Sequence, residues 1–192
     1  MTAGDAGRAR LVLDPGANAA SAGDRIDALT AEPASLLAVL YRDDLAAVTE
    51  ALAARSDRVE SAAVVAVGAD ATDHEAVRSV PDPTDLTGVG IAVGEWIRTR
   101  EASERPVVYV DSLSPVLRRA GDERAFRFLH ALTGRCRTGG VDAVAYVDPT
   151  AHDERTLATI RQVFDCQRRA GAAESAAGGR PVATDGGANR SE

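Results

Sequence analysis

Arg105-Pro106-Val107-Val108-Tyr109-Val110-Asp111-Ser112-Leu113 is the stretch that decides the fold. Its centre holds three valines and a tyrosine, and a short apolar run of this kind is typical of a strand covered on both faces in a parallel sheet. Pro106 stands at the edge of the run, where its missing N–H costs least. Asp111 therefore falls at the carboxyl end of the strand, the edge at which open α/β sheets bind ligands.

Strands and helices alternate along the chain on both sides of this stretch. Further apolar runs of strand length cover 36–41, 62–67 and 141–147. Residues at helical spacing follow them, and the expected helices begin at Asp43 or Asp44, Asp85, Asp122 and Thr150, where Thr150 to Asp153 resembles a capping box. Strands that alternate with helices predict right-handed crossovers, and therefore a three-layer α/β domain with a mostly parallel sheet.

The two ends of the chain differ in composition from its middle. Both are rich in alanine, glycine and polar residues, and the triplet Leu11-Val12-Leu13 is too short to organise the first of them. We therefore predict a disordered arm over 1–34, one α/β domain over 35–167 and a disordered tail over 168–192.

The charged residues narrow the range of functions. All 22 cationic residues are arginine, 29 residues are acidic, and the net charge is −7. Such a balance argues against general nucleic-acid binding, which needs a basic face. An aspartate-rich surface with arginine in place of lysine is typical of an extreme halophile. Without lysine, the chain has no P-loop lysine, no Schiff-base lysine and no lysine general base.

Cysteine spacing and hydropathy indicate a cytoplasmic protein. Cys136 and Cys166 are not in a metal-ligand spacing, so no metal site is expected. No window holds 18 consecutive apolar residues, which argues against a transmembrane helix. Residues 1–10 lack the pattern of a signal peptide. We expect a soluble cytoplasmic protein with reduced thiols and no membrane partner.

Polar residues gather where the predicted strands end. Asp111 and Ser112 follow the central strand, Asp43 and Asp44 follow 36–41, and Asp148 follows 141–147. Because the carboxyl ends of parallel strands meet at one edge, these residues are the candidate ligand-binding groups. In the alternative interpretation, Asp111 caps the turn that follows its strand.

Four segments carry a resemblance to a known family. They are Asp111-Ser112-Leu113, Phe126-Arg127-Phe128-Leu129-His130-Ala131-Leu132-Thr133-Gly134-Arg135, Asp148-Pro149-Thr150-Ala151-His152-Asp153-Glu154-Arg155-Thr156 and Arg161-Gln162-Val163-Phe164-Asp165. Together they resemble an uncharacterised haloarchaeal family of unknown function, distantly related to RecA- and KaiC-type ATPases. The resemblance covers roughly residues 36–165. It implies a RecA-like core and brings no established activity.

The phosphate-binding chemistry of RecA-type ATPases is missing from the expected place. These enzymes carry G-x-x-x-x-G-K-[ST] after their first strand, with backbone N–H groups and a lysine around the phosphates. We take 36–41 as the first strand here, and it leads through Tyr41-Arg42-Asp43-Asp44 into a helix without glycine or lysine. Two carboxylates at a helix start repel a triphosphate. The phosphate loop is therefore degenerate, and Asp111-Ser112 is a remnant of a Walker B strand end.

Three functions follow from this pattern. The preferred one is a non-catalytic RecA-like scaffold or regulatory domain that binds a partner protein or itself and needs no cofactor. The first alternative is an ATPase-like protein that binds a magnesium nucleotide and receives a lysine or arginine from a partner chain. The second is a divergent response-regulator receiver, in which Asp43, Asp44 and Asp111 would be the magnesium and phosphoacceptor acids. A receiver also needs a lysine, which this chain lacks.

Overall fold

Seven parallel strands form the middle layer of the molecule. A computed structural model describes residues 6–15, 20–42, 44–70, 76–100 and 105–170. In these residues the strand order is β4-β3-β2-β5-β6-β1-β7, and each neighbouring pair is parallel. The strands are β1 (Ala9–Leu13), β2 (Ala34–Leu40), β3 (Val59–Val67), β4 (Val77–Val80), β5 (Pro106–Val110), β6 (Asp142–Val147) and β7 (Cys166–Arg169).

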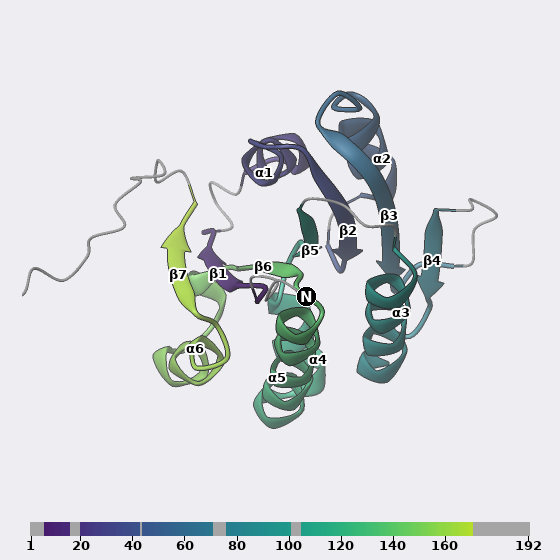
Figure 1. The fold of residues 1–192 in the computed structure, drawn as a ribbon. Helices are drawn as coiled ribbons and strands as arrows, with labels where there is room; N and C mark the ends of the chain where they lie inside the picture. Colours follow the sequence, from purple (N-terminus) through teal and green to yellow (C-terminus); the bar gives the residue numbers. More distant parts are fainter. Residues whose placement is uncertain (1–5, 16–19, 43, 71–75, 101–104, 171–192) are drawn as a thin grey trace, which may run out of the picture.

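Helices cover both faces of the sheet, as Figure 1 shows. Helices α1 and α2 lie on one face, and α3 to α6 lie on the other. They are α1 (Ala22–Leu29), α2 (Leu45–Ala53), α3 (Leu86–Thr99), α4 (Ser114–Ala120), α5 (Asp122–Thr138) and α6 (Glu154–Arg161), with a 3-10 turn, η2 (Pro149–Ala151), before α6. The three-layer α/β fold expected from the sequence is confirmed.

The continuous apolar runs are explained by this double covering. In β2, Leu36 and Leu40 pack in the cluster with α1 and α2, whereas Leu37 and Val39 pack in the cluster with α3 to α6. Successive side chains of a strand point to opposite faces, so a strand buried on both faces needs apolar residues at every position. The strands expected at 36–41, 62–67, 107–111 and 141–147 are confirmed as β2, β3, β5 and β6.

The predicted disordered arm over 1–34 is wrong where the structure describes it. Strand β1 lies between β6 and β7, and its Ala9 and Leu11 are completely buried. A strand of five residues is stable here because β1 forms backbone hydrogen bonds with a neighbouring strand on each side. Strand β1 also precedes β2 in the chain, so 36–41 is not the first strand. Residues 1–5 of the expected arm lie outside the described residues.

Two short edge strands were also missed. Strand β7 pairs with β1, so the predicted domain boundary at 167 cuts through a strand. Strand β4 lies between the strand expected at 62–67 and the helix expected at Asp85, where no strand was predicted, and it pairs with β3. Each edge strand exposes one side to solvent and carries few apolar residues, as in Cys166-Gln167-Arg168-Arg169. Most of the expected tail, 171–192, lies outside the described residues.

Aspartates cap three of the six described α-helices, α2, α3 and α6. Asp44 accepts a hydrogen bond from the backbone N–H of Ala47, and Asp85 caps α3 in the same way, as expected. The expected capping box at Thr150 is wrong. Residue Asp153 caps α6 instead, with its Oδ1 2.7 Å from the backbone N of Thr156. Pro149 and Thr150 belong to the 3-10 turn η2, which delays the start of the helix.

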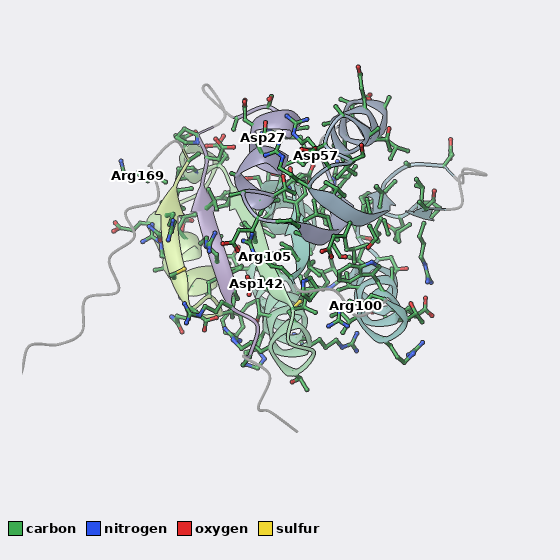
Figure 2. All side chains as sticks on the ribbon, turned by 45° about the horizontal axis from the view of Figure 1, so that its top comes forward. Asp27, Asp57, Arg100, Arg105, Asp142 and Arg169 are labelled. Atoms are coloured by element: carbon green, nitrogen blue, oxygen red, sulfur yellow. The ribbon has the colours of Figure 1, made fainter. Side chains whose placement is uncertain are left out.

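Helix α1 is held against α2 by charge. The carboxylate of Asp27 in α1, labelled in Figure 2, accepts hydrogen bonds from two residues that follow α2, from Arg55 at 2.6 and 2.8 Å and from Arg58 at 2.8 Å. The Arg55 guanidinium, with Arg58 beside it, holds the pKa of Asp27 well below its usual range. The contact fixes the position of α1, which carries Arg25 to the carboxyl edge of the sheet.

Candidate functional site

The candidate site lies where the sheet reverses its winding. Strand β2 is followed by α2 on one face, and the adjacent strand β5 is followed by α4 on the other. The carboxyl ends of two such strands leave a crevice, which is the usual ligand site of open α/β sheets. We call this region, between the ends of β2 and β5, the switch-point crevice. Asp111 is the first residue after β5, so the sequence correctly directed attention to this edge.

The carboxylate of Asp111 bridges the crevice. Its Oδ1 accepts a hydrogen bond from the backbone N of Tyr41, and its Oδ2 accepts one from the backbone N of Arg42, each at 2.7 Å. Asp111 is completely buried, and the backbone donors compensate for the removal of its carboxylate from solvent. Burial, together with the charge of Asp111, raises the pKa of Tyr41. Asp111 thus caps the loop after β2 rather than the turn of its own strand.

A buried ion pair closes the same edge beside β1. Nη2 of Arg25 lies 2.7 Å from Oδ2 of Asp14, and the two side chains are 1% and 2% exposed. Nη1 of Arg25 also donates to the backbone oxygen of Asp111 at 3.2 Å. The guanidinium carbon lies 4.7 Å from the centre of the Tyr146 ring, within cation–π range. Arg25 therefore connects the ends of β1, β5 and β6.

Sequence reasoning missed this ion pair. Asp14 follows β1 just as Asp111 follows β5, so the same signal, an acid after an apolar run, was present. It was overlooked because residues 1–34 were assigned to a disordered arm. Arg25 lies beside Ile26 and one turn before Leu29, on the buried side of α1, but an arginine is usually exposed, so its residue type gives no sign of burial.

The other candidate residues do not converge on the crevice. Ser112 is buried directly after Asp111. Asp44 is exposed and caps α2, and Asp43 lies outside the described residues. Asp148 accepts hydrogen bonds from the backbone N and Oγ1 of Thr150, at 2.9 and 2.7 Å. Within the described part of the chain, no three His, Cys, Asp or Glu side chains are grouped as a metal site requires.

A serine and a histidine meet at the carboxyl end of β6. Nε2 of His152 lies 2.9 Å from Oγ of Ser114, which also accepts a hydrogen bond from the backbone N of Asp148 at 3.3 Å. Burial, and then the charge of Arg118, lower the pKa of His152. Sequence reasoning had placed His152 at a helix start without this partner. Ser114 is only 4% exposed, so its hydroxyl serves the internal contact between α4 and the loop after β6.

The comparison with known families covers most of the chain. Residues 5–167 match DUF7504, described as a family of unknown function. The chain belongs to DUF7504. The match begins before β1, so the first strand and α1 are part of the DUF7504 domain rather than an appendage to it. No curated protein matches this DUF7504 sequence.

A solved structure supports the fold of this DUF7504 protein. A protein from Pyrococcus horikoshii OT3, solved in a structural study, is similar with a TM-score of 0.55 and 11% sequence identity. The similarity covers 83% of this chain and 79% of the Pyrococcus chain. At this identity the likeness concerns the fold alone. The three-layer arrangement with a parallel sheet is consistent with a RecA-like core.

The chemistry available at the DUF7504 crevice is that of a closed polar cluster. The acids at the ends of β1 and β5 bind groups of the same chain, namely Arg25 and two backbone N–H groups. Among the described residues, no helix has both the length and the apolar character to cross a bilayer.

Proposed function

We propose that this DUF7504 protein is a non-catalytic RecA-like scaffold or regulatory domain that binds a partner protein. One observation carries the proposal. In the switch-point crevice, the backbone N–H groups of Tyr41 and Arg42 both donate hydrogen bonds to the carboxylate of Asp111. A phosphate ligand in an α/β crevice is held by backbone N–H groups of this kind. Asp111 supplies an anion for these two N–H groups from within the chain, and a phosphate bound at the end of β2 would have to displace it.

The sequence between β1 and α1 supports the same proposal. It covers residues 14–21 and has the eight-residue length of G-x-x-x-x-G-K-[ST]. Its sequence is Asp14-Pro15-Gly16-Ala17-Asn18-Ala19-Ala20-Ser21. Aligned with the motif, Asp14 stands at the first glycine and Ala20 at the lysine, while Ser21 keeps the final hydroxyl. The carboxylate of Asp14 is paired with Arg25, and the position of the phosphate-binding lysine is an alanine.

The proposal is also compatible with the absence of lysine in the chain. A scaffold needs the packed sheet but not a catalytic lysine or a magnesium site. The buried Asp111 and the buried Asp14–Arg25 pair fix the carboxyl edge and the ends of three strands. Because these polar groups bind one another, the proposal places partner binding on the outer surfaces of the domain.

Thermal unfolding of the full chain with and without MgATP tests the proposal, in low salt and in molar KCl. A ligand that binds only the folded state stabilises it by about 2.7 kcal/mol at 100 times its dissociation constant. We expect no change in the unfolding midpoint. A rise in the midpoint, or ATP turnover proportional to protein concentration, would overturn the proposal. The matched ligand control is magnesium with inorganic sulfate, which reports effects of ionic strength alone.

A further inference from the structure

A long groove runs between α3 and α5, on the face of the sheet opposite α1 and α2. Two cavities of about 350 and 790 Å³ lie along it, and both are lined by Ile91, Ala131 and Arg135. Figure 1 shows the two helices side by side beneath the sheet. Arg135 crosses between them, with its Nη1 2.6 Å from the backbone oxygen of Gly90. The groove is separate from the switch-point crevice, because neither cavity is lined by Tyr41, Arg42 or Asp111.

The groove is lined in part by apolar and small residues. Ile91 is 46% exposed, and it is the large hydrophobic residue that the described chain leaves most open to solvent. Gly90, Gly94 and Gly134 line the same surface. A Cβ atom at Gly134 would meet no other atom within 4 Å, so the space above it is open, whereas Nη1 of Arg135 lies over Gly94 and Gly90. The open position at Gly134 lets another backbone approach closely there.

The lining of the groove is positively charged. It contains Arg98, Arg124 and Arg127, with Arg135 spanning it, and one acid, Glu95. Glu95 pairs with Arg78, which lies outside the groove, and Arg127 lies 3.7 Å from Glu123, so the positive excess rests mainly on the other three arginines. The whole chain carries a net charge of −7, so this concentration of arginine runs against the overall composition. Charge complementarity therefore calls for an acidic occupant.

We propose that this groove docks an acidic amphipathic helix of a partner protein. Its lining on α3 extends from Leu86 to Arg98, about 18 Å of helix, or roughly three turns of an occupant. The walls are helices, which offer no free strand edge for an extended peptide to pair with, so an occupant must satisfy its own backbone as a helix does. Apolar residues at i, i+3, i+4 and i+7 would cover Ile91, and acidic residues would meet the arginines. The inference rests on the proposed scaffold function and names its partner class.

The test uses a fluorescein-labelled synthetic helix of about 14 residues, with leucine at i, i+3, i+4 and i+7 and glutamate on the polar face. Fluorescence anisotropy measures its binding to the full chain in about 0.15 M and about 1 M KCl. We expect saturable binding that weakens with salt. It should weaken about tenfold or more in the Arg124→Glu/Arg127→Glu variant, and clearly in Ile91→Ser.

The matched control is Arg118→Glu/Arg119→Glu, which makes the same change of charge at two exposed arginines of α4. We expect less than about a threefold loss there. All of these side chains are exposed, so the variants keep their fold, and circular dichroism checks this. Equal losses in both double variants would overturn the proposal, because the attraction would then be general. Absence of binding by the wild-type chain would also overturn it, as would equal affinity for a peptide with lysine in place of glutamate.

Nucleic acid is the competing occupant for an arginine-lined groove. A fluorescein-labelled single-stranded DNA that binds more tightly than the acidic helix, and loses affinity in the same groove variant, would overturn the helix proposal. The scaffold function is tested separately by the MgATP measurement. Failure of the peptide with no MgATP effect removes only the groove proposal, whereas ATP turnover in a protein that binds the peptide removes only the scaffold proposal.

Discussion

Asp111 holds Tyr41 across the crevice between β5 and β2, with Oδ1 of one residue 2.7 Å from the backbone N of the other. A second bond reaches the backbone N of Arg42 at the same distance. A carboxylate is suited to this place because both of its oxygens accept, and both partners donate. The residue that most resembles a magnesium ligand in sequence is thus employed in fixing a loop.

Replacing Asp111 with asparagine should destabilise the fold. The amide group can accept from one backbone N–H, but its NH₂ then faces the other donor, which leaves a buried donor without an acceptor. We expect a loss of about 2 kcal/mol in the free energy of unfolding, measured with urea. Asp44→Asn is the control, because asparagine caps a helix as well as aspartate does. Equal stability of wild type and Asp111→Asn would contradict the structural role.

The Asp14–Arg25 pair should show strong coupling in a double-mutant cycle. Asp14→Asn and Arg25→Met each leave a buried charge without its partner, which costs about 3–5 kcal/mol. The double variant should lose less than the sum of the two, with a coupling energy above about 1 kcal/mol. The exposed Glu123–Arg127 pair, at 3.7 Å, is the control and should couple by about 0.5 kcal/mol or less. Additive losses at Asp14 and Arg25 would contradict the assignment.

Leu11→Ala tests whether the first strand belongs to the core. Leu11 is completely buried in the cluster with α3 to α6, so its truncation should cost about 3 kcal/mol in urea unfolding. Leu45→Ala in α2 is the comparison, since Leu45 is only partly buried and should cost less. A Leu11→Ala protein as stable as wild type would mean that β1 is dispensable.

The middle of the chain was predictable because its signals are local. Runs such as Val107–Val110 are long enough and apolar enough to predict a strand that is buried on both faces. Strand β1 gives no such signal, since three apolar residues stand between Arg10 and Asp14. Its stability comes from β6 and β7, which lie near the other end of the chain. A short strand bonded on both sides is stabilised by contacts that no local window contains.

The sequence predicted the position of Asp111 in the candidate site but not the groups that it binds. The position of Asp111 followed from its place after an apolar run, but its partners are backbone N–H groups, which have no side-chain signature. Arg25 is buried by contacts with Tyr109 and Tyr146, and both tyrosines are far from it in the sequence. Sequence patterns therefore locate an edge of the sheet and leave open whether a ligand or the chain itself fills it.

His152 should make the stability of the protein depend on pH near neutrality. Its pKa in the folded state is lowered, first by burial and then by the charge of Arg118, and the nearby Asp148 acts in the opposite direction. Below about pH 6.5, the usual histidine pKa, the unfolded chain therefore binds more protons than the folded one. The contribution of His152 to stability is fully present above that pH. It is lost as the pH falls from about 6.5 toward the folded pKa.

Urea unfolding between about pH 5.5 and 7.5 measures this slope, in a range above the usual titration of carboxylates. In His152→Gln the decline in stability toward low pH should be smaller than in wild type, because the titrating group is gone. His130→Gln, at an exposed position of α5, is the matched variant and should keep the wild-type decline. A wild-type decline that survives intact in His152→Gln would assign the pH dependence to another group. It would also reduce the contact between His152 and Ser114 to a packing interaction without electrostatic consequence.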